Sequence, residues 1–288
     1  MASPLVLTFE AQAAGPNLRH DLVQPLLLGR VPLEGVVLQP SPATASAGMF
    51  DNPKFQRGEF GLLDANWGDV LPAIEHGWDM VCIPVFLKRR PAYNFLWVRE
   101  GRGIDTPQGI AGKTVATMRY GTAANTYVRG FLQHFYNVDL TTITWQLSGP
   151  ERFALYDPRV RIEPAPGPHR SPAERLLAGE VDACSTGDIT DHRWWDALEA
   201  DPQVRRLFPD YREVNFRLFR EHGIYTPWHV LVMGGATYRS HPGLTRRLYE
   251  AFVASGELAL EDALGDGTSY SLLVDARETL RDQLVVCH

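Results

Sequence analysis

The chain alternates short apolar segments with amphipathic stretches from its beginning, and this alternation limits the folds that it can adopt. Leu5 to Glu10 and Gly35 to Gln39 have the composition of strands, and a helical stretch around Asp21 to Leu28 separates them. Such alternation predicts an α/β sheet that helices cover on both faces. A length of 288 residues is enough for about two such units.

A second opening of the same kind lies in the middle of the chain. Lys113 to Thr117 is predicted to be a strand, Met118 to Thr122 a loop, and Ala123 to Tyr136 a helix with apolar residues at helical spacing. Arg57 to Asp64 and Ala178 to Ser185 also resemble each other, because each has a Gly-Glu pair before an apolar strand. We therefore expect two similar lobes joined by crossing strands.

We expect lobe 1 to contain residues 1–97 and 229–288, and lobe 2 to contain residues 98–228. Ligands of open α/β sheets bind beyond the carboxyl ends of the strands. The residues that follow the predicted strands should therefore line a ligand cleft between the lobes.

Composition excludes two classes of partner. The net charge is -6 and the arginines are dispersed singly or in pairs, so the basic stripe of a nucleic-acid-binding protein is missing. The longest apolar stretches are far shorter than the roughly 18 residues that cross a bilayer. We expect no nucleic-acid or membrane partner, whereas a small organic anion and a homo-oligomer are both compatible with the sequence.

The cysteines and the N-terminus indicate a cytoplasmic protein. Cys82, Cys184 and Cys287 are an odd number without a Cys-x-x-Cys spacing, which argues against a disulfide framework or a structural zinc site. The segment Met1 to Glu10 lacks the basic start and the apolar stretch of roughly 7 to 15 residues that an export signal needs. Cys184 follows a predicted cleft strand, so a nucleophilic role is weighed against that of an inert buried thiol.

Three segments together resemble the 4,5-dihydroxyphthalate decarboxylase family: Arg205 to Arg212, Gly223 to His229, and Tyr127 to Leu132. The similarity runs from Gly29–Gly35 to His241-Pro242, which is nearly the whole chain. It implies a two-lobed fold like that of type 2 periplasmic binding proteins. It also implies cofactor-independent decarboxylation of a hydroxylated aromatic or heteroaromatic carboxylic acid.

The chain departs from this family at two places. Ala92 and Tyr93 stand where the family has an Arg-His pair, and Arg119 stands where the family tends to have an acidic residue. Both departures are expected in the cleft. The departures leave open a different aromatic or heteroaromatic acid as the substrate.

His229 and Arg89 are the candidate catalytic residues. His229 begins an apolar strand, and the family motif keeps a histidine here; the alternative is a core histidine that a backbone carbonyl satisfies. Arg89 aligns with an arginine of the family pattern, and its planar guanidinium can pair with a carboxylate. Arg89 is preferred to Arg90, although both could be solvated surface charges.

The loop Arg119, Tyr120, Gly121 and Thr122 is predicted to bind a substrate carboxylate, because backbone N–H groups at a helix N-terminus favour an anion. Plain helix capping by Thr122 is the alternative. In the loop after the first-lobe strand, Asp64, Asn66 and Trp67 are further substrate-binding candidates, together with Ser185 at the matching point of the second lobe. Capping by Asp64 and packing by Trp67 are the simpler interpretations.

Several catalytic patterns are absent from the sequence: a phosphate-binding loop, a Gly-x-Ser-x-Gly elbow and a His-Glu-x-x-His motif. We therefore expect no cofactor and no metal. The leading hypothesis is a decarboxylase in which Asn66 and Tyr120 contact ring hydroxyls and His229 protonates the ring. A dehydratase-type lyase on a cyclic enol acid and a solute-binding protein for a small organic anion remain as alternatives.

Overall fold

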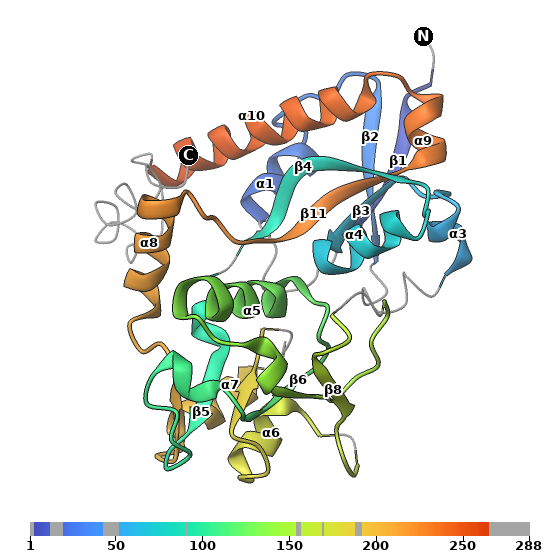
Figure 1. Cartoon of the computed structure of the whole chain (residues 1–288). Coiled ribbons are helices and arrows are strands. Elements are labelled where there is room, and N and C mark those ends of the chain that lie inside the picture. The colour runs from blue at the N-terminus through green and yellow to red at the C-terminus, as the bar shows by residue number, and fades with distance from the viewer. Residues whose placement is uncertain are drawn as a thin grey trace. The chain divides into compact units, whose positions relative to one another are not determined.

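The structure is a computed structural model that describes residues 3–11, 20–42, 52–89, 91–153, 157–168, 170–187 and 192–264 (Figure 1). The chain divides into two compact units. Unit 1 comprises Met1–Ala65, Ala73–Arg89 and His229–His288, and unit 2 comprises Asn66–Pro72 and Arg90–Trp228. The chain therefore passes from unit 1 to unit 2 directly after Ala65, and it returns for the last time directly before His229.

Unit 1 is built on a five-stranded sheet with the order β2-β1-β3-β11-β4. Its strands are β1 (Leu5–Ala11), β2 (Val36–Pro42), β3 (Leu62–Asn66), β4 (Met80–Arg89) and β11 (Pro227–Gly234). Strand β1 pairs in parallel with both β2 and β3. The N–H of Gly234 donates to the carbonyl of Gly61 at 3.3 Å, so the end of β11 lies beside the start of β3 and these two strands are antiparallel.

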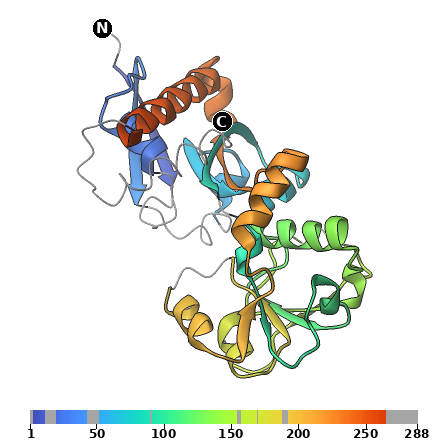
Figure 2. The same ribbon diagram turned by 90° about the vertical axis from the view of Figure 1, so that its left-hand side faces the viewer.

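The helices next to this sheet are α1 (His20–Leu27), α3 (Pro53–Gln56), α4 (Trp67–Glu75), α9 (Gly235–Ser240) and α10 (Leu244–Leu264). Helix α10 packs beside α1, as Figure 2 also shows. Phe9 of β1 and Phe252 of α10 meet edge to face in the core, with ring centroids 6.4 Å apart. Each such fully buried side chain contributes about 1.5–3 kcal/mol to folding.

Unit 2 contains a six-stranded sheet with the order β10-β5-β9-β6-β7-β8. Its strands are β5 (Leu96–Arg99), β6 (Thr114–Thr117), β7 (Thr144–Leu147), β8 (Arg161–Pro164), β9 (Ala183–Ser185) and β10 (Val204–Arg206). Strand β6 pairs in parallel with β7 and β9, whereas β5 runs antiparallel to β9 and β10. The expected lobe boundary between residues 97 and 98 thus falls inside β5, a strand of this sheet.

The helices of unit 2 are α5 (Ala123–Tyr136), α6 (Pro172–Leu177), α7 (His192–Ala200) and α8 (Tyr211–His222), with 3-10 turns at Tyr93–Phe95, Pro107–Ile110 and Leu140–Thr142. Helix α5 has the bounds that the sequence predicts. The side chain of Thr122 caps its start, and Asn137 ends it in the left-handed conformation.

Ala92 and Tyr93 lie in the core of unit 2, and the prediction that they line a ligand cleft is wrong. Tyr93 stacks on Phe131 with ring centroids 4.4 Å apart and meets Phe208 edge to face at 4.5 Å. An aromatic side chain gains more from this apolar surrounding than from water, so Tyr93 contributes to the packing of this core.

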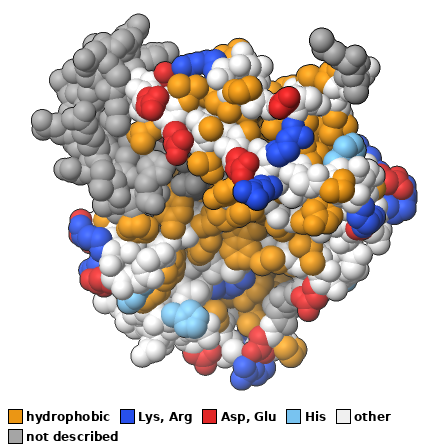
Figure 3. Space-filling view, turned by 90° about the horizontal axis from the view of Figure 1, so that it is seen from above, with side chains coloured by type: hydrophobic (Ala, Val, Ile, Leu, Met, Phe, Trp, Pro, Cys, Tyr) orange, Lys and Arg blue, Asp and Glu red, His pale blue; other side chains and the backbone are white. Residues whose placement is uncertain are grey.

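Charged side chains of both signs are interspersed on the face that Figure 3 shows, with hydrophobic side chains between them. No helix in the described ranges is long and apolar enough to cross a membrane.

Candidate active site

Asp64 and His229 form a buried polar pair in unit 1. Asp64 stands near the end of β3 and His229 near the start of β11, and the antiparallel run of these neighbouring strands brings them to the same end of the sheet. Oδ2 of Asp64 lies 3.0 Å from Nδ1 of His229. Asp64 is 0% exposed and His229 is 3% exposed, so both groups are shielded from water.

The pair defines which imidazole nitrogen is available for chemistry. An ionised Asp64 carboxylate only accepts hydrogen bonds, so this contact favours the His229 tautomer with the proton on Nδ1. No hydrogen bond to Nε2 occurs among the residues that the structure describes. A carboxylate, and not the backbone carbonyl of the simpler interpretation, therefore satisfies this histidine.

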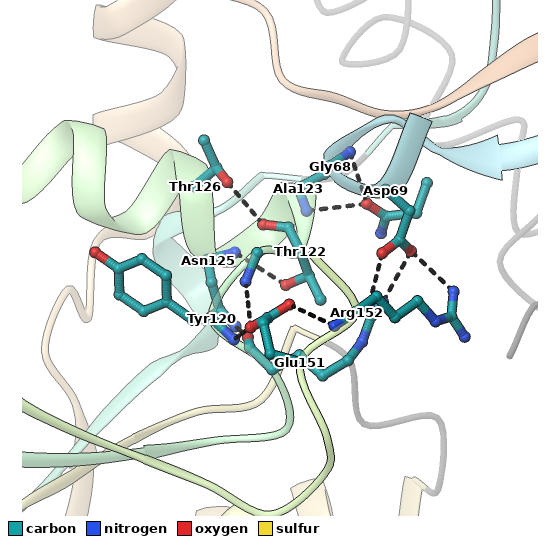
Figure 4. A network of polar contacts seen from close by, with 12 residues as sticks. Gly68, Asp69, Tyr120, Thr122, Ala123, Asn125, Thr126, Glu151 and Arg152 are labelled. Carbon is teal, nitrogen blue, oxygen red and sulfur yellow. Dashed lines mark hydrogen bonds and ion pairs between the residues drawn. The ribbon is translucent and has the colours of Figure 1, made fainter. Parts of the chain in front are cut away.

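Asn66, and not Asp64, caps the helices at this point of the chain. The Asn66 Oδ1 accepts from the backbone N–H groups of Gly68 in α4 and Ala123 in α5, both at 3.0 Å. These contacts within unit 2 join the last residue of β3 and the first turn of α4 to the start of α5 (Figure 4). The Nδ2 of Asn66 has no hydrogen-bond partner in the described part of the chain, so it can still donate to a ligand.

Arg119 forms an ion pair with Asp69 of α4. Its two terminal nitrogens reach the two Asp69 oxygens at 2.5 Å and 2.9 Å, the two-point geometry that guanidinium and carboxylate favour. Arg152 adds a third contact to the same carboxylate, from Nη1 to Oδ2 at 3.3 Å (Figure 4). The two arginines and the one aspartate leave a net positive charge in this group of three.

The Glu151 side chain binds the amide groups that the sequence assigns to a substrate carboxylate. Its Oε2 accepts from the N–H of Tyr120 at 2.6 Å and from the N–H of Gly121 at 3.0 Å (Figure 4). The preference of these amides for a carboxylate is therefore real, but in this structure a residue of the β7–β8 loop satisfies it. With Glu151 included, Asp69, Arg119 and Arg152 form a cluster whose charges balance.

Thr122 and Tyr120 have structural contacts. The Oγ1 of Thr122 accepts from the N–H of Asn125 at 3.5 Å, which is the capping alternative of the sequence. The Tyr120 ring belongs to the core of unit 2, with the Arg129 guanidinium 3.7 Å from its centroid and Trp145 at 5.5 Å. Burial raises the pKa of the Tyr120 hydroxyl. Contact between Tyr120 and a ring hydroxyl stays a prediction.

Trp67 is half-buried and held at its indole nitrogen. Nε1 donates to the carbonyl of Pro227 at 2.6 Å, and the Tyr127 hydroxyl donates to the same oxygen at 3.1 Å. The two rings meet edge to face at 5.6 Å, and burial raises the pKa of Tyr127 to about 12. Trp67 thus packs, as its simpler interpretation holds, and stacking on a substrate ring stays a prediction.

Ser185 and Cys184 are neighbours in β9 with different prospects. The Ser185 hydroxyl is buried and has no hydrogen-bond partner within the described ranges, so a ligand that donates or accepts there would satisfy it. The Cys184 thiol is fully buried, and burial raises its pKa. Because the thiolate is the nucleophile, the structure favours the inert thiol over the nucleophilic role.

Arg89 is the last residue of β4, and its side chain lies outside the described residues. Arg90 and Cys287 lie outside them entirely. In the ranges that the structure does describe, no group of three or more His, Cys, Asp and Glu side chains is arranged to hold a metal ion.

Asp69, Glu151 and Arg152 are the residues of this region that sequence reasoning missed. Asp69 is 50 residues from Arg119 and 83 from Arg152, and Glu151 is 30 residues from Gly121. No local spacing signals such pairs, because each depends on the tertiary approach of α4, the loop before α5 and the β7–β8 loop.

Sequence comparison finds two relatives that have the same name. No family model matches the chain. A "4,5-dihydroxyphthalate decarboxylase" of Comamonas testosteroni is 26% identical over 255 residues, which cover 84% of this chain and 73% of the relative. A protein of the same name from Pseudomonas putida is 28% identical over 109 residues, which cover 36% of this chain and 42% of the relative.

Solved structures show the fold. The periplasmic aliphatic sulphonate binding protein SsuA of Escherichia coli superimposes with a TM-score of 0.52 at 16% identity, over 91% of this chain and 75% of that chain. The putative periplasmic sulfonate-binding protein SsuA of Methylobacillus flagellatus KT gives a TM-score of 0.55 at 13% identity, over 91% of this chain and 71% of that chain. The predicted fold class and the predicted family resemblance are both confirmed: the chain has the α/β fold of type 2 periplasmic binding proteins and is similar in sequence to proteins named as carboxy-lyases.

Proposed function

We propose that this protein is a cofactor-independent decarboxylase of a hydroxylated aromatic or heteroaromatic carboxylic acid, with His229 as the proton donor. The observation that carries the proposal is the Asp64–His229 pair, with Nδ1 committed to a buried carboxylate and Nε2 left for a substrate. Similarity to a protein named as a decarboxylase over 84% of the chain supports the reaction class. The free thiols of Cys82 and Cys184 fit action in the reducing cytoplasm.

The proposed reaction consumes one proton, which His229 supplies to the ring and solvent replaces on His229. Protonated Nε2 of His229 donates its proton to the ring carbon that bears the carboxylate, and a ring hydroxyl ortho or para to that carbon stabilises the cationic intermediate. The bond between the ring and the carboxylate then breaks, its electrons restore the aromatic ring, and carbon dioxide leaves. The ring keeps the donated proton, and solvent reprotonates Nε2. A positioned acid of this kind raises the reaction rate by a factor of roughly 10² to 10⁴.

Three further groups are proposed to recognise the substrate. Arg89, at the end of β4 in unit 1, would pair with a substrate carboxylate through its planar guanidinium. In unit 2, the Asn66 amide nitrogen and the Ser185 hydroxyl are groups that a ring hydroxyl can satisfy. Binding a hydroxyl there stabilises the complex because a buried unpaired polar group costs about 1–3 kcal/mol.

The experiment is a panel of acids with carbon dioxide detection. The panel contains 4,5-dihydroxyphthalate, 3,4-dihydroxybenzoate and, as the control without a ring hydroxyl, benzoate. We expect carbon dioxide from a hydroxylated acid only and, in deuterium oxide, one deuterium at the carbon that lost the carboxylate. Turnover by folded His229→Gln should be lower than that of the wild type by a factor of roughly 10² to 10⁴.

The other outcomes identify the alternatives. Loss of water with all carbons retained, from a cyclic enol acid, would indicate the dehydratase. Tight binding of an acid without turnover would indicate a solute-binding protein. Wild-type activity in folded His229→Gln would remove His229 as the proton donor.

A further inference from the structure

We infer that Asp64 is the positioning residue of His229: it fixes which imidazole nitrogen bears the resting proton and where Nε2 points. The inference rests on the proposed function for its consequence in catalysis, and on geometry for the tautomer itself. It replaces the substrate-contacting role that the sequence suggests for Asp64. A side chain that is 0% exposed reaches a ligand only through a neighbour, and His229 is the neighbour that it contacts.

The hydrogen bonding of Asp64 is unusual for a residue kept only for stability. Oδ2 contacts His229, while Oδ1 is buried without a hydrogen-bond partner in the part of the chain that the structure describes. A carboxylate removed from water with one partner is costly, and buried ion pairs are often replaced by apolar residues without loss of stability. Burying the Asp64 carboxylate therefore costs folding free energy. What the carboxylate provides in return is a hydrogen bond that orients the His229 imidazole.

The neighbouring backbone makes the pair rigid. All five residues of β3 are buried, and β3 is hydrogen-bonded between β1 and β11 in the sheet. His229 is anchored in β11, whose residues from Trp228 onward are buried as well. Neither side chain can swing toward water without disturbing the sheet, so the contact at 3.0 Å orients the ring about its Cβ–Cγ bond.

The orientation has a chemical consequence. In neutral His229 the proton is on Nδ1 and the lone pair is on Nε2. Nε2 can then take up a second proton from solvent and give it to the substrate while Nδ1–H stays bonded to Asp64. Without the carboxylate, the ring could carry its proton on either nitrogen or turn by half a rotation. A turned ring takes Nε2 away from the substrate. A neutral ring with its only proton on Nε2 is a much weaker acid than the imidazolium, because donation would leave an imidazolate.

The test separates a positioning role from a structural one. We expect Asp64→Asn to lower kcat by at least about tenfold while KM changes by less than about twofold, because the substituted residue acts through the proton donor. Thermal unfolding of the variant is measured alongside, so that kcat and KM are compared for folded protein only. Asp79→Asn is the matched control: Asp79 is in the same unit and pairs with Arg239 at the surface.

A second readout needs no substrate. In protein labelled with nitrogen-15 at histidine, the His229 signal is assigned by its loss in His229→Gln. We expect the Nδ1–H tautomer in the wild type and in Asp79→Asn, and a mixed or Nε2–H tautomer in Asp64→Asn. An Nε2–H tautomer in the wild type, or one that Asp64→Asn leaves unchanged, would overturn the inference. The wild-type spectrum alone decides the matter if Asp64→Asn does not fold.

Failure of the proposed function is distinguishable from failure of this inference. A protein that releases no carbon dioxide from any acid, yet shows the Nδ1–H tautomer and its loss in Asp64→Asn, would lack the proposed activity and keep the positioning residue. If the protein releases carbon dioxide and Asp64→Asn leaves kcat unchanged, the proposed function is kept and the positioning role of Asp64 is rejected.

Discussion

The carboxylate of Glu151 accepts a hydrogen bond from the backbone N–H of Gly121 at 3.0 Å, at the N-terminus of α5. A β-carbon on Gly121 would lie 2.9 Å from Oε1 of Glu151, so glycine is what allows the carboxylate to approach. Since hydrogen bonds to charged groups contribute about 1.5–3 kcal/mol, Glu151→Ala should lower the free energy of unfolding by at least about 1.5 kcal/mol. Denaturant unfolding measures this loss.

Glu163→Gln is the control, because Glu163 is exposed on the neighbouring strand β8 and loses the same charge. We expect a change of less than about 0.5 kcal/mol there. Acetate at constant ionic strength should stabilise Glu151→Ala more than the wild type, since it can satisfy the freed amides. Equal losses of unfolding free energy in Glu151→Ala and Glu163→Gln would contradict the role of the Glu151 carboxylate.

Asp69 holds two arginines, and its removal should be more costly than that of a surface acid. In Asp69→Asn, Arg119 and Arg152 lose their shared carboxylate inside a partly buried cluster. Breaking a buried ion pair costs about 3–5 kcal/mol, and the partial exposure of both arginines puts our expectation near 3 kcal/mol. The exposed pair of Arg246 and Glu250 gives the comparison, where Glu250→Gln should cost far less, because solvent screens the charges of an exposed pair.

The strands and α5 could be predicted because their signals are local. Apolar runs bounded by turns mark β1, β4 and β7, and the bounds of α5 follow from the Thr122 cap and helical spacing. Helices α7 and α8 were not predicted. Helix α8 is rich in charged residues and has only Val214 and Leu218 buried, so its apolar face is too narrow to give a clear period.

The candidate site, too, could be predicted only in part from the sequence. His229 could be singled out because a histidine beside an apolar run requires an explanation, and Asp64 because an acidic residue directly follows the apolar Leu62-Leu63. Their pairing could not be predicted, because it depends on the antiparallel placement of two strands that are 165 residues apart at this contact. Arg119 was predicted to bind an acid, and the acid that it binds in this structure is Asp69.

Arg89 remains the candidate for a substrate carboxylate in unit 1. Arg89→Ala should weaken the binding of every carboxylate ligand by about 1.5–3 kcal/mol, the range for a charge-assisted hydrogen bond. Arg89→Lys should restore only part of the loss, because an ammonium keeps the charge without the planar two-point contact. Calorimetry with an acid that the wild type binds measures both variants, and unchanged affinity in Arg89→Ala would exclude Arg89 from the site.

Cysteine reactivity tests the assignment of Cys184 as an inert thiol. Desolvation by the surrounding protein raises the pKa of both thiols. For Cys82 this desolvation is partial, because the residue is still exposed at the surface, whereas Cys184 is fully buried. A raised thiol pKa lowers the thiolate fraction at neutral pH, so alkylation should accelerate at Cys82 as the pH rises toward 9 and stay slow at Cys184. We expect roughly a hundredfold difference in rate, since Cys184 reacts only after local opening.

Peptide mapping after iodoacetamide treatment measures the two rates. In guanidinium the rates should converge, because unfolding exposes both thiols. Faster modification of Cys184 than of Cys82 in the native protein would contradict its assignment and restore the nucleophilic role.

Gly68 is required where the start of α4 meets the start of α5. A β-carbon on Gly68 would lie 2.3 Å from the carbonyl oxygen of Gly121 and 2.7 Å from the N–H nitrogen of Ala123, and neither backbone atom can rotate away. Gly68→Ala should therefore cost about 3 kcal/mol, the upper end of the range for overpacking, and it should displace the Asn66 cap as well.

Gly130→Ala, inside α5, is the matched substitution: a β-carbon there meets nothing within 4 Å. Because alanine is the better helix former by about 1 kcal/mol, Gly130→Ala should raise the free energy of unfolding. Denaturant unfolding of the two variants should thus give shifts of opposite sign, and an unchanged stability in Gly68→Ala would show that the two helix starts do not meet as closely as 2.3 Å implies.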